Sequence, residues 1–163
     1  VFPGMQGGPH MNIIAAIAVA LKEAQTPEFK TYAQQVLKNA QVLANELTVR
    51  GYTLVTGGTD NHMVIIDFSG TQLDWSTAEK VLDEIGISTS KSTIPDDSNP
   101  PFHPSGLRIG MPAMTTRGVK EEETKQIAEF IDQALKNRKN REKLAELRNK
   151  VREFCKKFPV PSL

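Results

Sequence analysis

The organisation of this chain is clearest in one stretch, Pro100-Pro101-Phe102-His103-Pro104-Ser105-Gly106-Leu107-Arg108-Ile109-Gly110-Met111-Pro112-Ala113. A proline-rich approach leads into a short apolar strand, and the strand carries one arginine, Arg108, between Leu107 and Ile109. A guanidinium is costly to bury unless an anion meets it, and its planar fork can hold a carboxylate with parallel hydrogen bonds. Arg108 is therefore a candidate for binding a small carboxylic acid. An ion pair with an Asp or Glu elsewhere in the fold is the alternative interpretation.

The composition is typical of one soluble globular domain. The chain has 163 residues, of which 39% are hydrophobic and 24% are charged, and its net charge is +1. A net charge this small produces no positive field of the kind that attracts nucleic acids. The longest apolar run, residues 13–21, is shorter than the about 20 residues that a membrane span needs. We therefore expect no nucleic-acid partner and no membrane partner.

The single cysteine, Cys155, excludes an internal disulfide framework and a thiolate metal cluster. A reducing, cytoplasmic compartment fits this usage best. No His, Asp or basic residue at close sequence range indicates an activated thiol, so Cys155 is interpreted as a core-facing helix residue. The histidines are isolated from one another in the sequence, and no metal site is predicted.

Five helices and four short strands are predicted. The helices cover residues 9–24, 27–50, 75–85, 120–137 and a final segment that carries Leu144, Leu147, Val151, Phe154 and Phe158. The first helix is apolar on almost every side, so we expect it to be buried. The strands cover residues 52–55, 62–68, 87–89 and the segment around Arg108. Hairpin-like spacing favours an α+β fold, in which helices cover one small antiparallel sheet.

Three loops carry further candidate residues. Gly7 and Gly8 precede the first helix, where backbone amides can approach a phosphate or carboxylate, although a plain turn is favoured. Residues 57–62 are interpreted as a hairpin turn rather than a metal cluster. In the long loop 90–104, Phe102 can stack on a planar ligand, or it can anchor the loop to the core. These residues alone indicate an anion-binding α+β domain.

Several stretches together resemble the C-terminal part of serine hydroxymethyltransferase. They follow one another in the family's order: Val1–His10, Thr56–His62, Ser105–Gly110, Pro112–Ala113 and Thr115–Gly118. The resemblance implies a pyridoxal-phosphate enzyme of the aspartate-aminotransferase fold (fold type I), acting as a homodimer or higher oligomer. Residues 1–26 would form an interdomain loop and buried helix, and residues 27–163 the C-terminal small α/β domain. The family interconverts serine plus tetrahydrofolate with glycine plus methylenetetrahydrofolate.

The resemblance also implies residue roles. Arg108 matches the arginine that binds the amino-acid carboxylate, and Gly7 and Gly8 match the segment that approaches the cofactor phosphate of the neighbouring subunit. Ser92 and Phe102 match the region that lines the folate site. The family usually has an asparagine at the position of Ser92, where it contacts the pteridine, and serine is shorter.

The family's Schiff-base lysine, the aspartate at the pyridine nitrogen and the ring-stacking histidine belong upstream of Val1. This chain therefore has no predicted catalytic residue, and alone it is predicted to be inactive, because the lysine anchors and orients the cofactor. The alternative function comes from a different class. In it, a stand-alone or redesigned domain without catalysis would self-associate or assemble through its apolar first helix.

Overall fold

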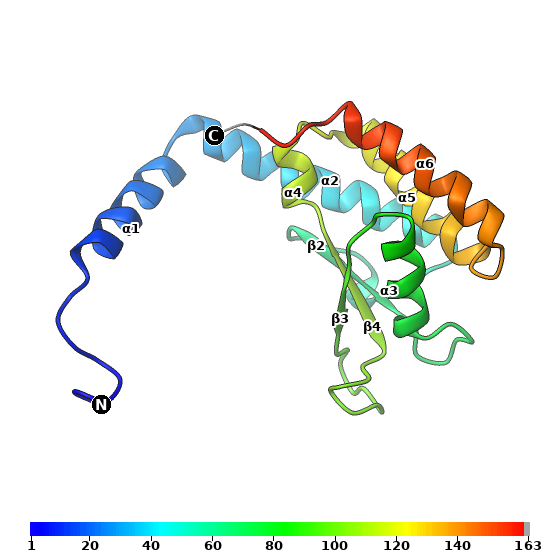
Figure 1. Cartoon of the computed structure of the whole chain (residues 1–163), viewed down its shortest axis with the longest axis horizontal. Helices are drawn as coiled ribbons and strands as arrows, with labels where there is room; N and C mark the ends of the chain where they lie inside the picture. The colour runs from blue at the N-terminus through cyan, green and yellow to red at the C-terminus, as the bar shows by residue number, and fades with distance from the viewer. Residues whose placement is uncertain (162–163) are drawn as a thin grey trace. The chain divides into compact units, whose positions relative to one another are not determined.

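The computed structural model describes residues 1–161 of the chain (Figure 1). It forms two compact units, residues 1–34 and the described residues from 35 onward. This division describes compactness. The predicted division into an interdomain segment, residues 1–26, and a C-terminal domain, residues 27–163, concerns function and stays a prediction. Within residues 1–161 no helix combines the length and the hydrophobicity that crossing a membrane requires.

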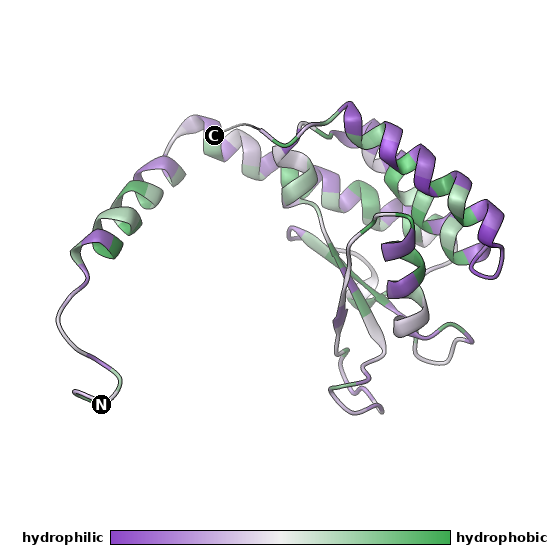
Figure 2. Cartoon of the chain, in the orientation of Figure 1, coloured by the Kyte–Doolittle hydropathy of each residue, from purple (hydrophilic) through white to green (hydrophobic). Residues whose placement is uncertain are grey.

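The first unit contains helix α1 (Met11–Ala24) and the first turns of α2 (Pro27–Val49). Helix α1 begins at Met11 rather than at the predicted Pro9, because its first helical hydrogen bond runs from the Ile14 amide to the His10 carbonyl. Figure 2 shows hydrophobic residues over its middle turns, yet no α1 residue is buried within this chain. Burial of α1 by another domain or chain therefore stays a prediction.

Helix α2 begins and ends as its sequence predicts. The Thr26 hydroxyl accepts a hydrogen bond from the Phe29 amide at 3.2 Å, and Pro27 occupies the first helical position. Gly51 follows the helix with a φ of 91°, the left-handed conformation that glycine adopts without strain.

The second unit contains a four-stranded antiparallel sheet, as predicted. Its strands are β1 (Thr53–Leu54), β2 (Met63–Asp67), β3 (Ser90–Ser92) and β4 (Gly106–Gly110), in the spatial order β1-β2-β4-β3. A 3-10 turn, η1 (Val55–Gly57), follows β1. The polar turn before β2 uses side chains as expected: the Asn61 carboxamide oxygen accepts from the Met63 amide at 3.0 Å. The described residues are thus α+β, with helices and one small sheet.

The edge strand β3 lies three residues later than predicted. The sequence favoured residues 87–89, but the Ile87 amide donates to the Leu82 carbonyl at 2.8 Å and completes the end of helix α3 (Trp75–Glu84). Strand pairing begins only at Ser90, which lies directly opposite Arg108 of β4. Asp74 and Ser76 are both residues that can cap α3, and the structure uses Asp74, whose carboxylate accepts from the Thr77 amide at 2.9 Å.

One face of the sheet is packed and the other is open. Side chains alternate along a strand, so the buried Leu107 and Ile109 of β4 share a face with Val64 and Ile66 of β2. Helices α2, α3, α5 (Glu121–Lys136) and α6 (Arg141–Lys156) complete this core. Their fully or almost fully buried side chains include Leu43, Leu47, Leu82, Ile131, Leu135, Leu144 and Leu147.

A short helix, α4 (Pro112–Thr116), follows β4 and was not predicted as a helix. Its end is linked to α2 by Asn39, which is fully buried. The Asn39 amide group donates to the Thr115 hydroxyl at 2.9 Å and to the Val119 carbonyl at 2.8 Å. Its carboxamide oxygen accepts from Gln35 at 2.9 Å, so both ends of this buried amide are paired.

Candidate functional site

Arg108 occupies the middle of β4 and projects to the open face of the sheet. Its neighbours Leu107 and Ile109 are buried, whereas Arg108 itself is exposed. Because the guanidinium is exposed, it carries no cost of burial within this chain. The exposed guanidinium is instead accessible to an anion that arrives from solvent.

One hydrogen bond holds the guanidinium. The Arg108 Nε donates to the Ser90 hydroxyl oxygen at 3.1 Å, across the pair that these two residues form in the β3–β4 register. No carboxylate among residues 1–161 forms an ion pair with Arg108. The alternative prediction of an internal ion pair is thus wrong for the described chain.

An open hollow of about 590 Å³ lies beside Arg108. It is lined by His62, Met63, Ser88, Thr89, Ser90, Arg108 and Gly110. The Thr89 hydroxyl is buried and has no hydrogen-bond partner among the described residues. The hollow therefore combines a cation with several polar groups, which suits a small anionic ligand. Thr89 was not predicted as a site residue, because residues 87–89 were expected to form the edge strand.

The loop before β4 is held by the carboxylate of Asp97. It accepts hydrogen bonds from the Ser105 amide at 2.8 Å, the Ser105 hydroxyl at 2.8 Å and the Asn99 amide at 3.0 Å. These donors, with the Ser105 amide foremost, lower the pKa of Asp97 from 3.8 to about 2. The loop thus reaches the start of β4 in a fixed conformation.

Phe102 does not anchor this loop to the core, so that alternative is wrong. Its side chain is 78% exposed. The Lys91 ammonium lies 5.9 Å from the Phe102 ring centroid and 5.6 Å from that of Trp75, within the range of cation–π contacts. Phe102 is therefore a free aromatic surface beside a lysine.

Ser92 shares the open face with Arg108 but does not line its hollow, and neither does Phe102. Ser92 pairs with Gly106, where a Cβ atom would lie only 2.5 Å from the Ser92 carbonyl oxygen. Only glycine allows so close an approach of the two backbones. The structure thus puts Ser92 and Arg108 on one face without bringing them into one cavity.

Gly7 and Gly8 lie in the first unit. Nothing within the described residues requires glycine at either position. Neither has a φ in the left-handed range between +20° and +160°, and a Cβ atom at either would meet nothing within 4 Å. The turn of this segment lies earlier, at residues 2–5, where the Met5 amide donates to the Val1 carbonyl at 2.7 Å. Gly8 itself lies at a bend, and the choice between a plain turn and a phosphate-binding segment stays open.

Fold and site together define a small α+β domain that presents an arginine on an open sheet face beside a polar hollow. A family model described as serine hydroxymethyltransferase matches residues 1–131 of the 163. The chain belongs to the serine hydroxymethyltransferase family. The resemblance seen in the sequence is thus confirmed.

The residues around Arg108 do not by themselves fit pyridoxal phosphate, the cofactor of this family. That cofactor needs a lysine amine for its aldehyde and a charged partner for its ring nitrogen. The lining of the hollow has neither a lysine nor a carboxylate. Among the described residues no group of three or more His, Cys, Asp and Glu side chains is placed to hold a metal ion.

Proposed function

We propose that this chain supplies the amino-acid carboxylate site of a serine hydroxymethyltransferase, and that Arg108 binds the carboxylate of serine or glycine. Family membership supports the reaction, the transfer of a hydroxymethyl group between serine and tetrahydrofolate. The observation that carries the assignment is the guanidinium itself, which is exposed, fixed at Nε and without an ion-pair partner in residues 1–161.

Ser90 positions this arginine for its task. Because the hydroxyl oxygen of Ser90 accepts from Nε and Arg108 lines the hollow, the terminal amino groups remain available to a ligand there. A carboxylate that meets both groups makes two charge-assisted hydrogen bonds, each worth about 1.5–3 kcal/mol. Thr89, whose hydroxyl lacks a partner, offers a further hydrogen bond to a polar ligand.

We expect residues other than those that line the Arg108 hollow to bind the cofactor. Pyridoxal phosphate, when bound, supplies the electron sink for carbanion chemistry. Without a lysine at the hollow, the chain alone is inactive in this proposal. Gly7 and Gly8 approach the cofactor phosphate of a neighbouring subunit in a homodimer or higher oligomer, an interpretation supported by the open space around both. Ser92 and Phe102 contact the folate, and the reaction is cytoplasmic.

Binding of glycine to the chain tests the role of Arg108. In an NMR titration, glycine is expected to shift the side-chain Nε resonance of Arg108, whereas glycine methyl ester, which lacks the carboxylate, is not. Arg108→Ala should weaken glycine binding at least 10-fold, and Arg108→Lys by an intermediate factor, because an ammonium cannot form the planar pair. Arg152→Ala removes an exposed arginine elsewhere and is the matched control. Glycine binding that Arg108→Ala leaves intact, or its absence in the wild type, would overturn the assignment.

Inactivity of the chain is tested separately. With added pyridoxal phosphate, serine and tetrahydrofolate, no hydroxymethyl transfer is expected. Borohydride reduction in the presence of the cofactor should label no single defined lysine. Stoichiometric labelling of one lysine would contradict this part of the proposal.

One observation favours a second candidate function, self-association through α1. Ile13, Ile14, Ile17, Val19 and Leu21 of this helix are all about half exposed or more. In this reading the chain is an assembly module without catalysis, and α1 is its interface. Light scattering is expected to give a mass above one chain, and an Ile14→Gln, Ile17→Gln variant should lower it. A wild-type chain that stays monomeric at high concentration would exclude this function.

A further inference from the structure

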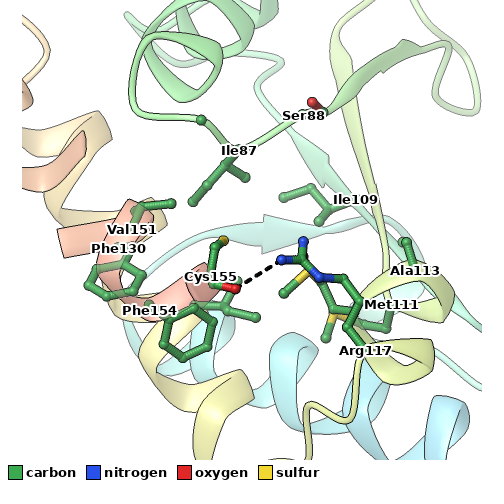
Figure 3. Close-up of a pocket in the computed structure, with 14 residues that line it drawn as sticks. Ile87, Ser88, Ile109, Met111, Ala113, Arg117, Phe130, Val151, Phe154 and Cys155 are labelled. Atoms are coloured by element: carbon green, nitrogen blue, oxygen red, sulfur yellow. Dashed lines mark hydrogen bonds between the residues drawn. The ribbon is translucent and has the colours of Figure 1, made fainter. Parts of the chain in front are cut away.

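A second cavity, of about 290 Å³, lies on the helix side of β4 (Figure 3). Its walls come from the end of β4, the segment after α3, and helices α4, α5 and α6, and most are apolar. Ile87, Ile109, Val151 and Phe154 contribute aliphatic and aromatic surface. The cavity is near the lower limit of volumes that hold small ligands.

One cation, Arg117, reaches into this apolar cavity. Its side chain follows α4 and is half-buried. The Nε donates to the Phe158 carbonyl at 2.6 Å, and Nη2 donates to the Cys155 carbonyl at 3.1 Å. Figure 3 shows the guanidinium extended among the lining side chains, with the dashed line to Cys155. Two of its three nitrogens therefore have oxygen partners.

The third nitrogen has none. Nη1 contacts only the sulfur of Met114, at 3.8 Å, and a thioether is a weak acceptor. No carboxylate within residues 1–161 forms an ion pair with Arg117. The carbonyls at the end of α6 offset part of the charge. Nη1 of this half-buried guanidinium therefore keeps donor capacity that the apolar walls cannot satisfy, and a carboxylate is the acceptor that matches it best.

We propose that this cavity binds a small carboxylic acid with an apolar body. The carboxylate accepts from Nη1 of Arg117, and the apolar part packs against Ile87, Ile109 and Val151. Charge complementarity selects an acid over the corresponding alcohol, and the apolar walls select it over a free amino acid. This site is independent of the function proposed for Arg108.

The two binding sites lie on opposite sides of β4. Ile109 points into the helix layer and lines the apolar cavity, whereas Arg108 points to the open face. Their rims meet at Ser88 and Gly110, which line both. A test must therefore show which arginine an acid uses.

The thiol of Cys155, the single cysteine, lines the cavity and provides the readout. The rate at which a maleimide alkylates this thiol is measured with hexanoate or hexanol as the probe. Saturating hexanoate should slow alkylation at least 5-fold, and hexanol should need at least 10-fold higher concentration for the same protection. Equal potency of acid and alcohol, or no protection by either, would overturn the proposal.

Variants then assign the acid to one arginine. Arg117→Gln should abolish the preference for hexanoate over hexanol, and Arg108→Ala should retain it; the reverse pattern refutes the site. Since Arg117 also holds the end of α6, the fold of its variant is checked by circular dichroism. If Arg117→Gln unfolds, Ala113→Phe provides the decision, because Ala113 lines the cavity and a phenyl ring would fill it. This variant should lose protection by both probes, and retained protection would refute the site.

Discussion

On strand β4, Leu107 and Ile109 point into the helix layer, whereas Arg108 between them points to an open surface. The packed face contains apolar side chains from four helices and three strands. The open face carries Arg108, Ser90 and Ser92, and nothing among the described residues pairs with the terminal amino groups of Arg108. Neighbours in the sequence thus differ in their surroundings: one face holds the buried core of the domain, and the other carries the arginine for which we propose carboxylate binding.

The largest effect on stability is expected when two sequence neighbours, one on each face of the sheet, are each replaced by alanine. Leu107→Ala removes a fully buried side chain and should lower the free energy of unfolding by about 2–5 kcal/mol. Arg108→Ala, one residue away, should change it by no more than about 0.5 kcal/mol. Urea denaturation of both variants measures the difference. Comparable losses in the two would mean that the faces are not divided in this way.

An intermediate effect is expected from Asn39, a polar residue within the packed layer. Asn39→Ala leaves the Val119 carbonyl without its donor and should cost about 1–3 kcal/mol of unfolding free energy. Asn45→Ala makes the same change at an exposed position of α2 and is the matched control. Equal denaturation midpoints for the two variants would show that the buried amide is not needed for stability.

The smallest effect is expected on the loop before β4, and only in acid. The folded state lowers the pKa of Asp97 to about 2 from 3.8, so its stabilising contribution is complete above about pH 4 and is lost as the pH falls through 2. The amide signals of Asn99 and Ser105 should therefore shift between pH 4 and pH 2 in NMR spectra. In Asp97→Asn this titration should be absent. A wild-type midpoint near 4 would contradict the hydrogen bonding described.

The sequence predicts most elements because local signals and burial agree in them. Asp74 caps α3, Gly51 ends α2, and the spacing of Leu144, Leu147, Val151 and Phe154 defines the buried side of α6. Errors arise where a backbone group has two possible partners. The Ile87 amide bonds within the end of α3 instead of joining the sheet, which moves the edge strand to Ser90.

The candidate site was less predictable. The apolar neighbours of Arg108 identify it as a candidate binding residue. The exposure of its side chain, however, depends on which face of the sheet the helices cover. The role of Ser90 depends on the β3–β4 register, and that of Arg117 on the end of a helix 38 residues further along the chain. Contacts between distant segments leave no local pattern in the sequence.

Gly106 carries a consequence for how this sequence can change over time. A side chain there would collide with the Ser92 carbonyl and push β3 from β4, and Ser90 would leave Arg108 with it. Gly106 is buried and does not line the hollow beside Arg108, yet any other residue there would displace the strand that holds the arginine two positions away. The carboxylate recognition that we propose for Arg108 thereby depends on a neighbouring position whose side chain is a single hydrogen atom.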